Sequence, residues 1–154
     1  MTKLECIESR LHGNSIKINN FAICDTIKAM SHIVHGKKSI ALNKGALCGK
    51  SDEASVLAEE LGHFETMEFY TVTPTFNSPI MRNNRMKQEA RARNWAYREY
   101  CTPEEIEAAF RQNGTYGEYA VAECCQVTTE FLHRAIEYHR SCGVVFSFDN
   151  IDCA

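Results

Sequence analysis

The amino-acid sequence predicts a mixed α+β fold, in which a small β-sheet or hairpin packs on a central helix and a helical part follows. Residues 51–64 show helical apolar spacing, three short strand-like runs precede them, and helix-type segments dominate after residue 84. The 154 residues suffice for one domain with a core. We expect a single domain: a site-bearing core over 1–100, a helical extension over 101–140 and a tail over 141–154.

The central helix is expected over residues 51–64. Ser51 is suited to cap it, because a serine oxygen accepts from the unpaired N–H groups of a first turn. Asp52 and Glu53 follow, where the helix dipole favours negative charge. Apolar side chains recur at helical spacing and form one stripe, namely Ala54, Leu57, Leu61 and Phe64.

The opposite face of this helix carries candidate chemistry. Glu59 and His63 are four residues apart and lie together, and Glu60 stands one position round from Glu59. A zinc-protease helix reads H-E-x-x-H, with metal ligands at i and i+4 and a glutamate as general base. Here residues 59–63 read E-E-L-G-H, and a carboxylate oxygen is also an accepted zinc ligand. The alternative is a solvated acidic face with an incidental histidine.

Before this helix, we expect a short helix over residues 4–11 and a strand within 15–23. A hairpin over 31–43 follows, with its turn at His35-Gly36-Lys37-Lys38. His32 and His35 sit near this hairpin. Turn histidines are mostly solvated, with reach to a metal as the alternative.

After the central helix, residues 65–84 are rich in threonine, proline and asparagine and predict an irregular run that walls a cleft. The second clear helix is expected over 85–100. Its Ala92 and Ala96 allow close approach of another helix, and Trp95 is expected to be a packing anchor. Read alone, Glu89 of this helix is a surface ion-pair partner.

Three further helices are predicted, over about 103–111, 119–125 and 128–140. The last two have the spacing of a helix-turn-helix motif. Because the second of them carries balanced acidic and basic residues, we favour a pair of helices that pack on each other over a DNA-binding motif. In the tail, four apolar side chains are expected to dock on the body, Val144, Val145, Phe146 and Phe148.

Composition narrows the classes of function. A net charge of −3 gives no general attraction to nucleic acid or anionic membrane. No apolar run reaches membrane-spanning length and the first residues lack a secretory apolar segment, so a cytoplasmic location is expected. The eight cysteines form no C-x-x-C pair and are expected to be reduced thiols, several of them buried. Cys48 precedes the central helix closely enough to crowd its site.

These segments together resemble the ImmA/IrrE family of metallo-endopeptidase domains. The resemblance runs through residues 39–43 (SIALN) and 57–63 (LAEELGH), and then through 89–96 (EARARNWA), which is similar to the family's E-x-x-A-x-x-F-A helix. Thr102-Pro103 falls where the family's next helix opens, and residues 124–139 resemble its C-terminal helices.

The resemblance covers roughly residues 1–140 and implies a zincin-like fold with a gluzincin-like zinc site. His63 and Glu89 would be metal ligands and Glu60 the general base. Glu59 takes the place of the family's first histidine ligand, which resembles a variant associated with mobile-element members. A ligand set richer in carboxylates makes manganese possible and suggests a weak or narrowly specific protease.

The family resemblance also implies a substrate. It points to cleavage of a repressor protein of helix-turn-helix type, as in a prophage or conjugative-element anti-repressor or a stress response. Tyr70, Tyr97 and His133 are candidates for stabilising the oxyanion. The competing readings are a non-catalytic protein-binding regulator of the same fold, a DNA-associated regulator and a plain structural domain.

Overall fold

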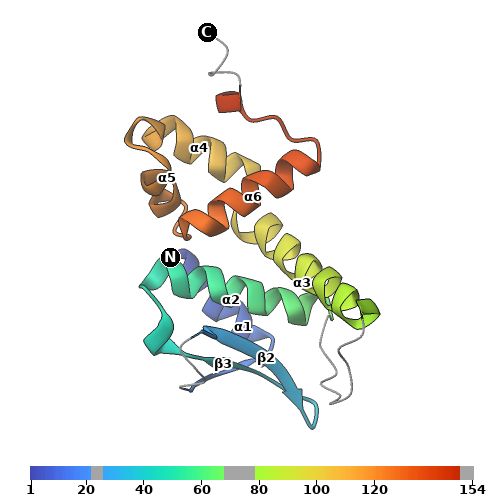
Figure 1. The fold of residues 1–154 in the computed structure, drawn as a ribbon. Helices are drawn as coiled ribbons and strands as arrows, with labels where there is room; N and C mark the ends of the chain where they lie inside the picture. The colour runs from blue at the N-terminus through green and yellow to red at the C-terminus, as the bar shows by residue number, and fades with distance from the viewer. Residues whose placement is uncertain (22–25, 68–78, 150–154) are drawn as a thin grey trace.

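The computed structural model describes residues 1–21, 26–67 and 79–149 of the chain. Within these residues the fold is mixed α+β and mostly helical, as predicted (Figure 1). The helices are α1 (Lys3–Gly13), α2 (Lys50–Glu65), α3 (Pro79–Tyr100), α4 (Pro103–Asn113), α5 (Glu118–Cys124) and α6 (Thr129–Ser141), with short 3₁₀ turns η1 (Lys44–Ala46) and η2 (Gly114–Tyr116). The strands are β1 (Lys17–Asn20), β2 (Ala29–Val34) and β3 (Lys37–Leu42).

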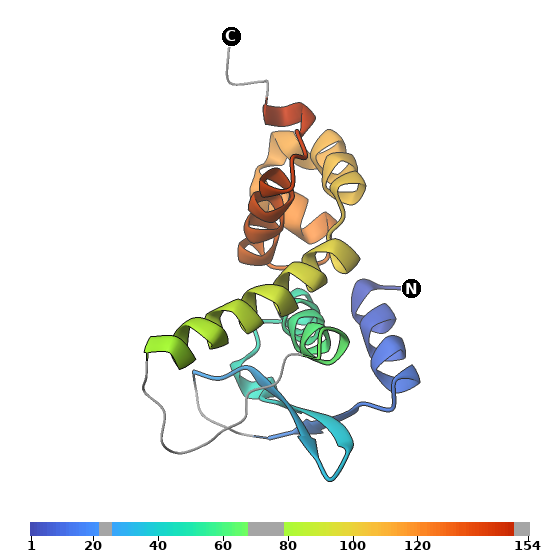
Figure 2. The same ribbon diagram turned by 90° about the vertical axis from the view of Figure 1, so that its right-hand side faces the viewer.

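The three strands form one sheet in the order β1-β3-β2, with β1 parallel and β2 antiparallel to β3. The predicted hairpin is confirmed, although its turn is only His35-Gly36. Both turn residues have positive φ, 49° and 74°, as a tight two-residue hairpin turn requires. Ile40 and Leu42 are fully buried, and α2 lies over one face of the sheet with α1 beside it (Figure 2).

The predicted apolar stripe of α2 is confirmed, since Ala54, Leu57, Leu61 and Phe64 are all at most 3% exposed. The predicted cap is wrong, because α2 begins at Lys50 with Gly49 in the N-cap position. Among the described residues no side chain caps α2, and the Asp52 carboxylate in its first turn instead accepts the N–H of Cys48, the residue before the N-cap, at 3.0 Å.

The α3 helix begins at Pro79, six residues earlier than expected. Proline suits a first helical position because it has no N–H to leave unpaired there. Residues 68–78 of the predicted irregular run lie outside the described residues. Trp95 is confirmed as an anchor: it is 8% exposed and meets the Tyr100 ring edge to face, with the ring centroids 5.9 Å apart.

The last three helices begin and end close to their predicted positions. Thr102 Oγ1 accepts the Glu105 N–H at 3.3 Å, and Thr128 Oγ1 accepts the Phe131 N–H at 3.1 Å. In the tail, Phe146 is fully buried and stacks with Phe148. The expected docking of Val145 is wrong, because that side chain is 74% exposed.

The six cysteines in the described part of the chain carry free thiols, as expected, and Cys101 and Cys125 among them are fully buried. Across the same residues, the longest apolar stretch of any helix falls short of what a bilayer crossing needs.

The contact between α2 and α3 is unusually close at Gly62. A Cβ atom built on Gly62 would lie 2.3 Å from the carbonyl oxygen of Ala92. Ala92 and Ala96 are fully buried, which confirms that small side chains let the two helices approach. Gly62 is therefore required by the packing of α3 rather than by a turn.

Replacing Gly62 by alanine should destabilise the protein by at least about 2 kcal/mol, because the backbone of α3 must move away from the new methyl group. Urea unfolding measures this difference. Gly13→Ala is the matched control, because nothing lies within 4 Å of a Cβ built there. Equal stability of the two variants would contradict the close helix contact.

Candidate metal and catalytic site

The contact between Gly62 and Ala92 brings two predicted site residues together. His63 follows Gly62 on α2, and Glu89 lies about one helical turn before Ala92 on α3. His63 Nε2 is 3.7 Å from Glu89 Oε2, with the imidazole 9% and the carboxylate side chain 34% exposed. Interaction with His63 holds the pKa of Glu89 below its usual range. Glu89 thus pairs with a histidine on another helix while its side chain stays partly exposed.

Glu60, the predicted general base, lies beside the sheet. Its carboxylate hydrogen-bonds to the hydroxyl and backbone of Ser31 on β2. Burial raises the pKa of Glu60, and the nearby His63 and the Ser31 hydrogen bonds offset only part of this rise. A carboxyl group held in this way is fixed in position and binds its proton more tightly than an exposed one.

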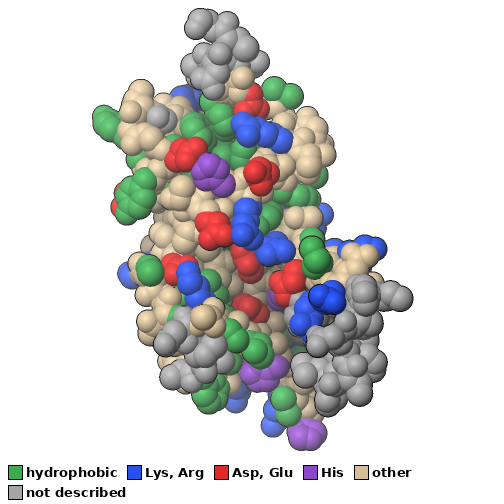
Figure 3. Space-filling model, viewed as in Figure 1, with side chains coloured by type: hydrophobic (Ala, Val, Ile, Leu, Met, Phe, Trp, Pro, Cys, Tyr) green, Lys and Arg blue, Asp and Glu red, His purple; other side chains and the backbone are tan. Residues whose placement is uncertain are grey.

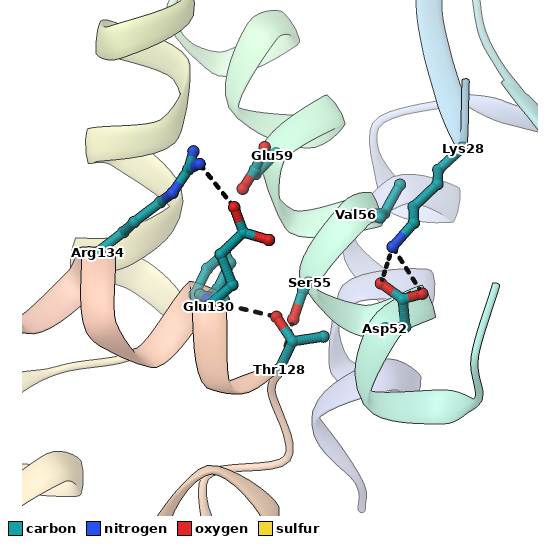
Figure 4. A pocket seen from close by; sticks show the side chains of 9 residues that line it. Lys28, Asp52, Ser55, Val56, Glu59, Thr128, Glu130 and Arg134 are labelled. Atoms are coloured by element: carbon teal, nitrogen blue, oxygen red, sulfur yellow. Dashed lines mark hydrogen bonds and ion pairs between the residues drawn. The ribbon is translucent and has the colours of Figure 1, made fainter. Parts of the chain in front are cut away.

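Glu59 lines a different surface of α2. It borders a cavity of about 250 Å³ between α2 and α6, together with Glu130 and Arg134 of α6 (Figure 4). Arg134 donates to Glu130 at 2.6 Å, and the Thr128 N–H donates to Ser55 Oγ at 3.0 Å across the same gap. In this conformation the Glu59 carboxylate points into the α6 cavity, which His63 and Glu89 do not line.

Burial raises the pKa of Glu59 to about 7, although Arg93 and Arg134 favour its charged form. Glu60 and Glu89 add to the rise through repulsion. Glu59 and Glu60 thus interact electrostatically with Glu89, and Glu60 also interacts with His63. Even so, within residues 1–21, 26–67 and 79–149 no three histidine, cysteine, aspartate or glutamate side chains are grouped closely enough to hold a metal ion.

No protein-family model, curated protein or solved structure matches this chain. The assignment of a function therefore rests on the chain's own residues and their geometry.

The other histidine and cysteine candidates come from the hairpin and from the residues before α2. His32 Nε2 is 2.9 Å from Ser39 Oγ, directly across the hairpin, and His35 is an exposed turn residue. Cys48 is exposed at the opposite end of α2. His35 thus agrees with the expected solvated role, whereas His32 is partly buried and pairs with Ser39.

Two of the three oxyanion candidates are described. His133 is exposed and lies 2.7 Å from Glu118, toward α5. Tyr97 is buried, its ring meets Phe131 edge to face, and burial raises its pKa to about 12. Because Glu59 and Arg134 both influence Tyr97, its hydroxyl belongs to the Glu59 side of the site. Tyr70 lies outside the described residues.

Sequence reasoning missed two neighbours of the site, Ser31 and Arg134. Arg93, by contrast, was detectable, because it follows Glu89 by four residues and such residues share a helix face. Ser31 and Arg134 come from other elements and reach α2 only in the folded chain. Sequence reasoning also missed the ion pair between Lys28 and both carboxylate oxygens of Asp52, each at 2.9 Å. This pair connects the start of the sheet hairpin to α2.

The Glu59 carboxyl predicts a pH dependence of stability. Its pKa rises from 4.5 to about 7 on folding, so the folded state binds this proton more tightly than the unfolded state. The free energy of unfolding is then greatest below about pH 4.5. It falls by up to about 3 kcal/mol as the pH rises from there to about 7, and it stays low at higher pH.

Glu59→Gln should remove this loss. In protein stripped of metal by a chelator, the variant should be more stable than the parent at about pH 8 and similar to it near pH 4.5. Urea unfolding at both pH values tests this, with Glu8→Gln on the exposed face of α1 as the control. A Glu59→Gln variant less stable than the parent at pH 8 would contradict burial of this charge.

Proposed function

We propose that this chain is a zincin-like metallo-endopeptidase domain of the ImmA/IrrE type. The observation that carries the proposal is the meeting of His63 and Glu89, 3.7 Å apart across two closely packed helices. The two residues are far apart in sequence, and the resemblance assigns both as metal ligands. Glu60, assigned as general base, lies on α2 three residues before His63 and interacts electrostatically with both His63 and Glu89.

The chemistry of the residues fits a zinc ion. An imidazole nitrogen and carboxylate oxygens are donors that zinc accepts in catalytic sites, where three protein ligands leave a position open. His63 and Glu89 would hold the metal from α2 and α3, and Glu59 would complete the set once its side chain turns toward His63. With two carboxylates among the ligands, manganese is an alternative.

A bound zinc ion would supply an acidified water and polarisation of the scissile carbonyl. The residues of the chain then have separate tasks. The Glu60 carboxylate takes a proton from the attacking water and returns it to the leaving amine, a task suited to a carboxyl whose pKa is raised by burial. Ser31 holds Glu60 in place, and the Tyr97 hydroxyl, protonated at neutral pH, is available as a donor.

We further propose that the substrate is a repressor-type protein with a helix-turn-helix domain, as the resemblance implies for a mobile-element or stress-response switch. The alternative is a catalytically inactive member of the fold that binds and regulates another protein. One observation favours this alternative: the Glu59 carboxylate lies in the α6 cavity, apart from the pair formed by His63 and Glu89.

Metal content separates these two functions. Purified protein supplied with zinc should hold about one zinc or manganese ion per chain, as elemental mass spectrometry measures. His63→Ala should lose the metal, because its nitrogen donor is gone. His12→Ala, an exposed histidine at the end of α1, is the control and should keep it. Parent protein that stays free of metal would favour the protein-binding regulator.

Glu60→Gln tests the assigned base. This variant should stay folded and keep its metal while peptide cleavage falls by about a hundredfold or more, because the amide cannot accept the proton. The assay follows a helix-turn-helix repressor by intact mass. Glu137→Gln, an exposed glutamate of α6, should leave cleavage unchanged. Full cleavage by Glu60→Gln would rule out its role as the base.

A further inference from the structure

The N-terminal half of α3 concentrates positive charge in an acidic chain. Residues 79–94 contain four arginines and one lysine against a single carboxylate, Glu89, whereas the whole chain has a net charge of −3. Arg82, Arg85, Lys87 and Arg91 are exposed and Arg93 is partly exposed. In Figure 3, lysine and arginine side chains gather at the right-hand edge of the molecule, on the side where Figure 1 places the start of α3.

Helical geometry divides these cations between two faces. At about 100° per residue, Arg82, Arg85 and Arg93 fall within about 40° of Glu89, whereas Lys87 and Arg91 point the opposite way. We call the first three the α3 cationic face. With a rise of about 1.5 Å per residue, it extends roughly 10 Å before Glu89 and 6 Å after it. The candidate metal ligand therefore lies within a row of arginines.

The inner end of this row acts on the site itself. Arg93 favours the charged forms of both Glu59 and Glu89. Arg82 and Arg85 belong to the first half of α3 (Pro79–Tyr100), which extends away from α2 in Figure 2. A partner of opposite charge would be attracted along this row.

Two kinds of polyanion could use such a face, nucleic acid and acidic protein segments. Nucleic acid carries phosphates along its whole length and would meet the net negative charge of the chain. It would also meet the carboxylate of Glu89 within the row. A short peptide has few carboxylates, so these can lie against the arginines while its neutral residues lie beside Glu89. The charge pattern favours the peptide.

We propose that the α3 cationic face binds an acidic peptide segment next to the site, so that the protein selects substrates with glutamate or aspartate beside the bond that is cut. This inference rests on the proposed function for its link to cleavage. The docking of the acidic segment needs neither metal nor Glu60, so it can be tested separately.

The test uses the full chain carrying Glu60→Gln, in the presence of a chelator. Fluorescence anisotropy measures binding of a labelled peptide with glutamate at alternate positions, and of the same peptide with glutamine or lysine in those places. The glutamate peptide should bind best, and its affinity should fall as salt is raised to about 0.15 M, where surface charges are screened over about 8 Å.

Two double variants locate the binding. R82Q/R85Q removes two charges from the α3 cationic face and should weaken binding of the glutamate peptide about fivefold. K87Q/R91Q removes the same charge from the opposite face of the same helix and should change binding little. Circular dichroism should show that both variants stay folded.

The outcomes separate the two proposals. If binding of the glutamate peptide is charge-selective and is lost only in R82Q/R85Q, the α3 cationic face is supported. If the parent protein also holds no metal, the proposed peptidase function alone fails. Equal binding of the three peptides, or equal loss in both double variants, overturns the face. Binding of duplex DNA in preference to the glutamate peptide, weakened by R82Q/R85Q, also overturns it and assigns the face to nucleic acid.

Discussion

The close approach of α2 and α3 at Gly62 and Ala92 is the constraint on which the candidate site depends. With no side chain on Gly62, the two backbones come within a distance that any Cβ atom would prevent. His63 is the next residue on one helix, and Glu89 is about one turn away on the other. A larger residue at position 62 would therefore separate the imidazole from the carboxylate as well as loosen the core.

The same crossing sets the electrostatics of the site. Glu60 and Glu89 lie near the His63 imidazole in a partly desolvated region, whereas the neighbouring Glu59 has its carboxylate in the α6 cavity. Burial and mutual repulsion raise the pKa of Glu59 and Glu60, whereas contact with His63 lowers that of Glu89. A cluster of acids is costly without compensating positive charge. Protons, nearby arginines or a bound cation each reduce that cost, which is why this region is the one where metal binding is physically reasonable.

The sequence predicted the helices and the hairpin well because these follow from local periodicity and turn chemistry. The stripe of α2, the hairpin turn that contains His35-Gly36 and the cap at Thr102 are of this kind. It failed at Pro79, where turn-forming residues concealed the start of a helix. For the site, the i, i+4 spacing and the family resemblance predicted Glu59, His63 and Glu89 as ligands, of which the structure brings His63 and Glu89 together and places Glu59 at the α6 cavity. The contact of Glu60 with Ser31 and the cavity with Arg134 depend on tertiary packing, which no spacing along the chain specifies.

The position of the Glu59 carboxylate distinguishes the proposed peptidase from the alternative regulator, because only the peptidase needs Glu59 as a metal ligand. With a pKa of about 7, its carboxyl carries a proton about half the time at neutral pH, so a metal ion must displace that proton to use it as a ligand. Turning the side chain out of the α6 cavity would leave no cation stranded, because Arg134 already pairs with Glu130 at 2.6 Å. Metal binding should therefore strengthen with rising pH through this range, and its main competitor at Glu59 is a proton rather than an arginine.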